Sequence, residues 1–211
     1  MKKTFVNIIA VIGIPLFLLG LIVSLILAYD FGHYSMLVNT ISELGSIQYT
    51  EYPMAINITF MVSALFLSFF FIKLFRKIHH NAKKKRIYNF LSIFGFILLE
   101  LMTGSFFFVG IFNVDISYIL HISFAITVFV SLLFAEIIFG FLILRLKIFS
   151  KHFGYLMMLG HISVALLFPI MPQAVLEWSM FFVLLIWGIP LSLKFTLEVA
   201  NKKFNLLNRF I

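Results

Sequence analysis

The sequence predicts an all-α polytopic membrane protein, a bundle of six transmembrane helices that forms one domain over residues 1–211. Three observations lead to this fold class: 63% of the residues are hydrophobic, only 11% are charged, and six long apolar runs alternate with polar connections. Soluble domains have about 45–50% apolar and about 25% charged residues, so this chain carries too few charges to cover a water-facing surface. Its net charge of +8 therefore indicates membrane topology, and no nucleic-acid partner is expected.

Each apolar run is long enough to be a transmembrane helix. About 20 mainly apolar residues cross the roughly 30 Å of bilayer hydrocarbon. Segments exposed to lipid must satisfy their own backbone hydrogen bonds, so these runs are expected to be helical. The first run is much longer than the apolar core of about 7–15 residues in a cleaved signal peptide, which predicts a retained helix. The predicted spans cover about residues 5–29, 54–75, 87–112, 118–144, 152–171 and 178–199.

The cations predict the orientation of the bundle. All 16 Lys and Arg lie at the N-terminus, in the second and fourth connection regions and at the C-terminal end, which six alternating spans place on one side. The positive-inside rule makes that side the cytoplasm, with both termini cytoplasmic, in a multi-pass protein of the cell membrane. Membrane lipids are the expected partners. One basic run is favoured as a simple topology anchor, and contact with anionic head groups is the alternative. This run is Lys83, Lys84, Lys85 and Arg86.

The first outer connection, residues 30–53, contains a helical pattern. Apolar residues recur there at i, i+4 and i+7, two polar residues fall opposite them, and Gly45 is a natural stop. We predict a short amphipathic helix over residues 35–44 that lies in the outer interface. The apolar positions are Leu37, Ile41 and Leu44, and the polar positions are Asn39 and Glu43.

A first set of candidate functional residues lies on the outer side at similar depth. Carboxylates beside an imidazole suit general acid–base chemistry or a metal-bound water. The chain has no cysteine and no HExxH-type motif, so no cofactor is evident, and a divalent metal site would have to assemble across helices. The alternative interpretation is a set of hydrated interface groups and helix caps. The candidate catalytic residues are Glu43, His121 and Glu177, and the candidate pocket residues are Ser42, Asn57, Asp115 and His33.

The acids of this outer set have no Lys or Arg on their side of the membrane. Mutual repulsion should raise a carboxylate pKa or recruit a cation or a ligand head group. We expect Glu43 or Glu177 to lie within hydrogen-bonding reach of His121, directly or through one water or ion.

A second set lies within the predicted spans. Ionisable residues are costly in a bilayer and are functional candidates by default. Glu100, Glu136 and His161 together suggest a proton path. The alternative is that Glu100 hydrogen-bonds to Ser or Thr on a neighbouring helix and that Glu136 reaches towards the cytoplasmic cations.

Several short motifs carry a family resemblance. They are NTISELG at 39–45, Pro53, Asn57, GIF at 110–112, His121, Glu177–Trp178 and IWG at 186–188. With them the chain resembles the six-helix membrane family catalogued as domain of unknown function 998. Members often have Pro after GIF, where this chain has Asn113. The resemblance implies six helices and no established activity. It also implies a distant likeness to Frag/DRAM-type membrane proteins, some linked to lipid remodelling, and favours the outer set of residues.

These observations support one leading functional hypothesis and two alternatives. The leading one is an outward-facing polar pocket, covered by residues 35–45, that binds or processes a lipid or small amphiphile. Glu43 and Glu177 would orient or deprotonate the ligand, and His121 would act as acid–base group or ligand-binding group. The first alternative is a proton-coupled small-molecule transporter that uses the intramembrane Glu and His residues. The second is a non-catalytic membrane partner. The chain has no phosphate-binding loop, nucleophile elbow or dinucleotide fingerprint.

Overall fold

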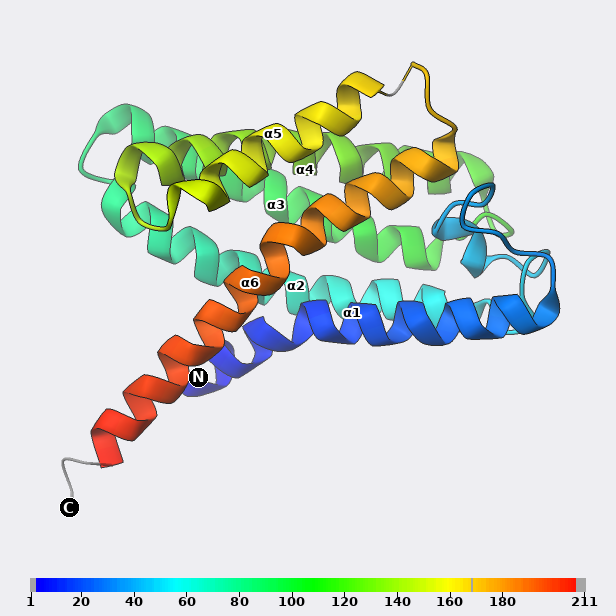
Figure 1. Ribbon diagram of the computed structural model, residues 1–211, viewed down its shortest axis with the longest axis horizontal. Helices are drawn as coiled ribbons and strands as arrows, with labels where there is room; N and C mark the ends of the chain where they lie inside the picture. The colour runs from blue at the N-terminus through cyan, green and yellow to red at the C-terminus, as the bar shows by residue number, and fades with distance from the viewer. Residues whose placement is uncertain (1–2, 168, 208–211) are drawn as a thin grey trace.

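The computed structural model describes the backbone over residues 3–167 and 169–207, and the side chains over residues 12–167 and 169–197. It confirms an all-α fold with six long helices (Figure 1). The first connection adds one short 3₁₀ helix, η1. The helices are α1 (Lys3–Phe31), η1 (Ser42–Gly45), α2 (Met54–Ala82), α3 (Arg86–Ile111), α4 (Tyr118–Leu146), α5 (Lys151–Leu167) and α6 (Gln173–Leu207).

Within the described residues, five helices are long and apolar enough to cross a membrane: α1, α2, α3, α4 and α6. The fifth predicted span, 152–171, is corrected to α5, a shorter helix of 17 residues that ends at Leu167. Pro169 and Pro172 follow closely. Proline lacks a backbone N–H and disfavours a continuing helix, so the helix ends before the apolar run does.

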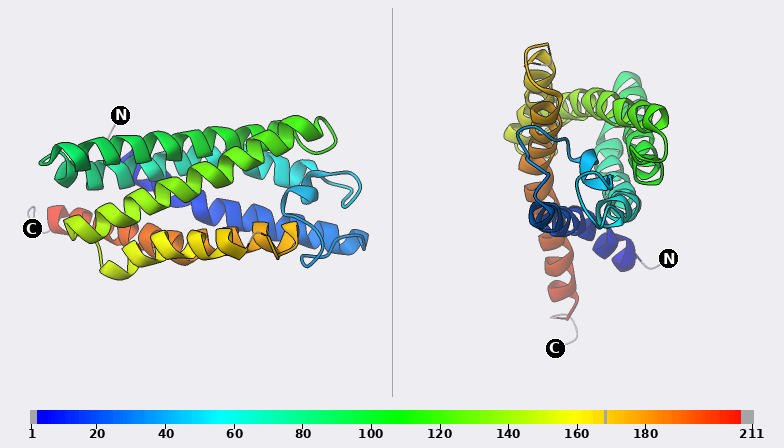
Figure 2. Two further views of the ribbon diagram at one scale, coloured as in Figure 1. Left: turned by 90° about the horizontal axis from the view of Figure 1, so that it is seen from above. Right: turned by 90° about the vertical axis from the view of Figure 1, so that its right-hand side faces the viewer.

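The helices form a ring in chain order. Each helix packs against the next, α6 returns to pack against α1, and α2 also contacts α4 across the ring (Figures 1 and 2). One end holds residues 32–53 with η1, the α3–α4 connection and residues 169–172, and we call it the acidic end. The other holds the turns at 83–85 and 147–150, and we call it the basic end.

Glycines let two helix pairs approach closely. A Cβ added to Gly140 of α4 would lie 2.6 Å from the carbonyl oxygen of Gly154 in α5. A Cβ on Gly110 of α3 would lie 2.5 Å from the carbonyl oxygen of Asn57 in α2. Small residues at helix crossings are how backbones pack tightly in lipid, so these contacts set the α4–α5 and α2–α3 spacing.

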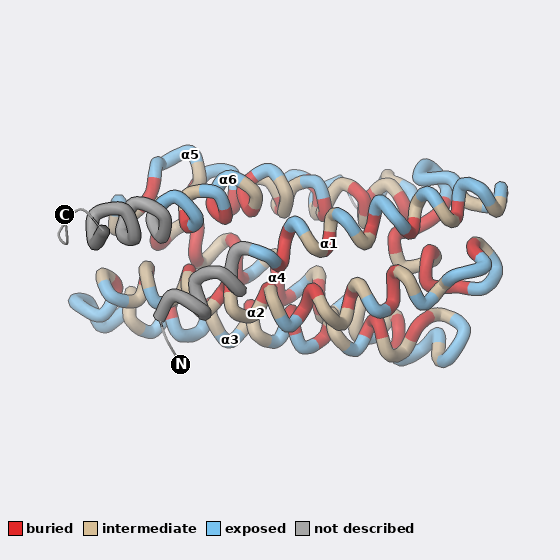
Figure 3. Tube along the Cα trace, turned by 90° about the horizontal axis from the view of Figure 1, so that it is seen from below, coloured by how far each residue is buried: buried red, intermediate tan, exposed pale blue. Residues whose placement is uncertain are grey.

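Burial follows the ring. Figure 3 shows buried segments on the faces that the helices turn towards one another, and exposed segments on their outer faces. Large apolar residues such as Leu19, Ile97 and Ile126 are exposed there. Lipid tails are as apolar as these side chains, so an exposed apolar surface of this extent fits a bundle surrounded by a bilayer.

The orientation of the bundle is a prediction that the cysteine-free chain makes easy to test. Single-cysteine variants at Ile47 and Ile116, both exposed at the acidic end, should react with an impermeant thiol reagent added to intact cells. A cysteine at Ser150, exposed at the basic end, should react only after permeabilisation. Labelling of the Ser150 variant in intact cells, with protection of the other two, would invert the predicted topology.

Candidate functional site

The first connection turns inward at the acidic end. Ile41 and Leu44 are buried among the helices, whereas Leu37 is 76% exposed and Asn39 is buried. The predicted amphipathic helix over residues 35–44 is therefore replaced by turns followed by η1, which has only four residues. Two of the three apolar residues of the predicted face, Ile41 and Leu44, are buried, so the segment inserts into the end of the bundle.

One hydrogen bond anchors this segment to the bundle. The side-chain amide of Asn57, in the first turn of α2, donates to the carbonyl oxygen of Gly45 at 3.1 Å, and both residues are buried. A Cβ on Gly45 would overlap the amide oxygen of Asn57, so glycine is needed for this close approach. The predicted pocket residue Asn57 is thus a structural anchor for η1.

Glu43 and Thr40 form a reciprocal cap on the same segment. Oε2 of Glu43 accepts hydrogen bonds from the Thr40 backbone N–H at 2.7 Å and from the Asn39 side chain at 3.3 Å. In return, Thr40 Oγ1 accepts from the backbone N–H of Glu43 at 3.3 Å. This is the arrangement of a capping box, whose sequence signature is Ser or Thr followed three residues later by Glu. The structure places Glu43, a candidate catalytic residue, in a capping position.

Two residues at the start of α6, and Tyr34 of the first connection, also hydrogen-bond to this segment. Oε1 of Glu177 accepts from the backbone N–H of Ser42 at 3.3 Å. The indole N–H of Trp178 donates to the carbonyl oxygen of Asn39 at 3.1 Å. The hydroxyl of Tyr34 donates to the carbonyl oxygen of Thr40 at 2.8 Å. Burial raises the pKa of Tyr34, and the nearby charge of Glu177 raises it further, so this phenol stays a neutral donor.

The α3–α4 connection also hydrogen-bonds to the segment, through Asp115. Asp115 accepts from the hydroxyl of Ser46 at 2.7 Å and from the backbone N–H of Ile47 at 2.9 Å. Asn113, at the position where the resemblance suggests Pro, accepts from the backbone N–H of Ile116 at 2.9 Å and so shapes the turn. The structure therefore brings together Ser42, Glu43, Asn57, Asp115 and Glu177 through the segment 39–47.

The two histidines of the outer set do not join this network through hydrogen bonds. His121 is buried, and its Nδ1–H donates to the carbonyl oxygen of Phe112 at 2.9 Å. Among the described residues, no direct hydrogen bond joins His121 to Glu43 or Glu177, so the direct form of the expected contact is absent, and the form bridged by one water or ion stays a prediction. His33 is exposed and packs edge-on against the Phe31 ring. No group of three or more His, Cys, Asp or Glu within the described part of the chain is arranged to hold a metal ion.

A cavity of about 80 Å³ lies beneath the segment, inside the ring. Ser42 and Glu177 bring polar side chains to it, and the other described residues that line it are apolar or aromatic. Leu67 and Leu132 line it near the middle of α2 and α4, so it extends from the acidic end into the bundle. The apolar lining is Phe17, Ile41, Phe60, Leu67, Met102, Phe106, Val109, Ala125, Val128, Phe129, Leu132, Met180, Phe181 and Leu184.

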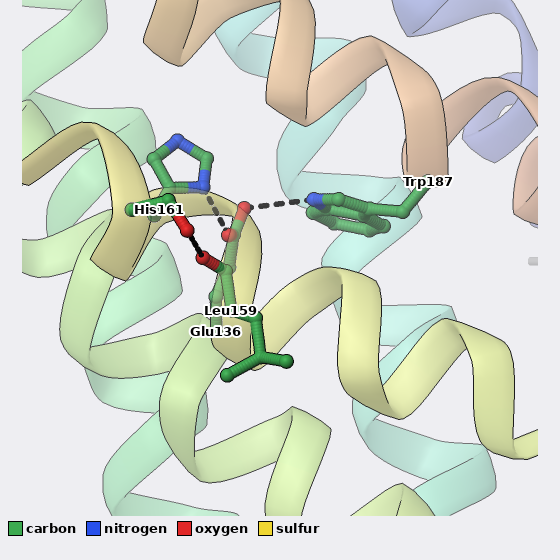
Figure 4. A network of polar contacts seen from close by, with 5 residues as sticks. Glu136, Leu159, His161 and Trp187 are labelled. Atoms are coloured by element: carbon green, nitrogen blue, oxygen red, sulfur yellow. Dashed lines mark hydrogen bonds and ion pairs between the residues drawn. The ribbon is translucent and has the colours of Figure 1, made fainter.

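The intramembrane set divides into two separate contacts. Glu136 of α4 meets Nδ1 of His161 in α5, and its Oε1 accepts from the indole N–H of Trp187 in α6 at 2.9 Å (Figure 4). All three side chains are fully buried. Glu100 of α3 instead accepts from the hydroxyl of Ser68 in α2 at 2.6 Å. Glu136 is therefore paired inside the bundle and does not reach the basic end, and Glu100 has the Ser partner that one interpretation expected.

Sequence reasoning missed three partners in these contacts. Thr40 was signalled by the T-x-x-E spacing with Glu43. Trp187 stands in the IWG motif, but no local pattern pairs it with Glu136. Ser68 is one of several small polar residues in its span, and only the packing of α2 on α3 selects it.

Comparison with known proteins shows the family. The family described as Protein of unknown function (DUF998) matches residues 11–193, which is most of the chain. The chain therefore belongs to this family, as its motifs suggested. No curated protein and no solved structure matches it. The family description names no activity, so a function has to be argued from the site.

The capping arrangement predicts how Glu43 contributes to stability. Glu43→Ala should lower the free energy of unfolding by about 1–3 kcal/mol, because the buried Thr40 N–H loses its acceptor. Glu43→Gln keeps one acceptor oxygen and should cost less. Thermal unfolding of the purified protein in detergent measures both. Glu51→Ala, which removes an exposed acid from the same connection, is the control and should be silent. Equal effects of the Glu43→Ala and Glu51→Ala changes would contradict the cap.

Proposed function

We propose that this member of the DUF998 family binds the hydrocarbon chain of a lipid or small amphiphile in the central cavity, with the polar group of the ligand at Ser42 and Glu177. One observation carries the proposal: the cavity is apolar along its length and polar at one end. An amphiphile has this same division. With the basic end at the cytoplasm, the polar end of the site would face outward.

The size and lining of the cavity favour a single chain. Small-molecule sites usually measure roughly 300–1,000 Å³, so about 80 Å³ suits part of one chain better than a whole lipid. Apolar cavities stay dry and accept hydrocarbon, because water inside them finds too few polar partners. In the cavity wall, the ring of Phe17 meets the rings of Phe106 and Phe181 edge-to-face, which gives the ligand a rigid aromatic surface.

The polar end selects the head group. Ser42 brings a hydroxyl, Glu177 brings a carboxyl group, and no Lys or Arg is among the described residues that line the cavity. One oxygen of Glu177 accepts from the Ser42 N–H, which leaves further lone pairs for a ligand donor. An anionic head group would find no cation to pair with among these residues. We therefore infer an ammonium or hydroxyl group on the ligand.

The wall between α4 and α6 offers access from the bilayer. Ala125 and Phe129 of α4 and Met180 and Leu184 of α6 line the cavity, yet each is only half-buried. α5 lies between α4 and α6 in the ring and packs against both, but it ends at Leu167, so the entry would lie beside its end. A chain could thus enter sideways, while segment 39–47 covers the acidic end. In this proposal Glu43 stabilises segment 39–47 above the cavity, and Glu177 faces the ligand.

A proton-coupled transporter is the second candidate function, and the buried Glu136–His161 contact is the observation that favours it. Imidazole and carboxylate in contact can exchange a proton without a long jump. The third residue of that hypothesis, Glu100, hydrogen-bonds to Ser68 on a different helix pair, so the three residues do not form one hydrogen-bonded chain among the described contacts.

The cavity proposal predicts a difference between two adjacent positions. Ala125→Phe fills the cavity and should weaken binding of a monoacylglycerol, a single-chain lipid with a hydroxyl head group, by about tenfold or more, equivalent to about 1.4 kcal/mol. Ile126→Phe, on the exposed face of the same helix, should leave binding unchanged. Native mass spectrometry of the protein in nanodiscs, titrated with this lipid, measures both. Equal binding by both variants would contradict the cavity site and favour a partner protein without a ligand site.

The transporter candidate makes its own prediction at Glu100. Glu100→Gln keeps an acceptor for the Ser68 hydroxyl, so we expect unchanged expression and unfolding temperature. Proton uptake into proteoliposomes, followed with a pH-sensitive dye, should match that of the unaltered protein. Proton uptake that the unaltered protein shows and a well-folded Glu100→Gln variant lacks would support coupled transport over the cavity proposal.

A further inference from the structure

We propose that the basic end carries a second lipid site, in which Lys84, Lys85 and Arg145 bind the phosphate group of an anionic phospholipid. A pocket of about 260 Å³ lies there, lined by Asn81, Lys84, Lys85, Tyr88, Arg145 and Leu146. It lies at the opposite end of the bundle from the cavity proposed above, and the inference does not rest on that function.

The cations converge on this pocket from separate parts of the chain. Lys84 and Lys85 belong to the turn between α2 and α3, and Arg145 lies in the last turn of α4. No acid is among the described residues that line the pocket. Three like charges around one hollow repel one another, so an anion between them is favoured. Arg and Lys are also the residues that bind phosphate best, Arg by paired hydrogen bonds and Lys as a point charge.

Aromatic rings hold two of these cations in place. Nζ of Lys85 lies 5.5 Å from the centre of the Tyr88 ring, and Cζ of Arg145 lies 5.5 Å from that of Phe141. The two rings meet edge-to-face with centres 6.2 Å apart. Cation–π contacts of this kind fix the position of a charge without neutralising it. The pocket is thus organised around cations whose charge is still available.

The surface beside the pocket favours a lipid over free phosphate. From the start of α3, a stripe of exposed apolar residues runs along the helix away from the basic end. A phosphate in the pocket would place acyl chains against this stripe, at the depth where head groups meet hydrocarbon. The stripe consists of Ile87, Phe90, Phe94 and Ile97, which are 58%, 60%, 43% and 56% exposed.

Two neighbouring lysines provide matched controls. Lys83 precedes Lys84 and Lys147 lies two residues after Arg145, and both are exposed, but neither lines the pocket. Diffuse attraction between a basic surface and anionic lipid would depend on all of these cations alike. A built site depends on those in the pocket.

The test measures lipid selectivity of the full chain in nanodiscs that contain phosphatidylglycerol and phosphatidylcholine. Spin-labelled phosphatidylglycerol reports the fraction of lipid held at the protein. Removal of one pocket cation, by Lys84→Gln or Arg145→Gln, should lower the relative association of phosphatidylglycerol about tenfold, because a hydrogen bond between a charged group and the phosphate is lost. Lys83→Gln and Lys147→Gln should change it by less than about twofold, because exposed cations outside the pocket interact only weakly. Arg145→Lys should keep part of the selectivity.

Two results would overturn the inference. Equal losses in the pocket variants and in the Lys83 and Lys147 variants would show diffuse attraction. Displacement of the spin-labelled lipid by millimolar inorganic phosphate would show a site for a soluble anion. Unchanged unfolding temperatures in all variants are required for either comparison, and Ala125→Phe should retain the selectivity because it alters only the other cavity.

Discussion

Buried backbone groups of the segment 39–47 must find partners inside the end of a membrane bundle, and the rest of the site depends on this constraint. An unpaired N–H or C=O there would cost several kcal/mol, so each bond has a positional role. Asn57 pairs with the Gly45 carbonyl and Glu177 pairs with the Ser42 N–H, while Asp115 accepts from the hydroxyl of the buried Ser46. These partners come from α2, α6 and the α3–α4 connection. The same bonds that bury the segment therefore tie the helices together at the acidic end.

A second buried network lies deeper in the bundle, with one member on the same helix as Glu177. Trp187 lies ten residues further along α6, and its indole N–H bonds to Glu136, which also meets His161. Buried charges are stable only when they are paired and hydrogen-bonded, so this contact links α4, α5 and α6 in one arrangement. The cavity lies between these two levels of polar contact, and its apolar lining separates them.

The helices could be predicted because a 20-residue apolar run has few other structures available in lipid. Pro169 also indicates where α5 ends, but the predicted span extends to residue 171 because the sequence stays apolar beyond that proline. The predicted helix over residues 35–44 is wrong. Leu37, Ile41 and Leu44 share a face only if the backbone is helical throughout, and the Thr40–Glu43 cap starts a new turn between Leu37 and Leu44. The position of His121 along its helix does not specify its angle around the bundle, and its ring turns to Phe112. Contacts such as Glu136 with Trp187 depend on packing alone.

Amide hydrogen exchange of the segment 39–47 tests this account most directly. Single-residue exchange rates, measured by NMR on the protein in nanodiscs, report whether an amide is bonded and closed to water. The account predicts slow exchange at Thr40, Ser42 and Ser46, whose N–H groups bond to the Glu43 side chain, the Glu177 side chain and the Glu43 carbonyl oxygen. The exposed turn at Met36 and Leu37 should exchange fast. Equally fast exchange at all five residues would contradict the account, because the segment would then lie open at the membrane surface and leave the cavity uncovered.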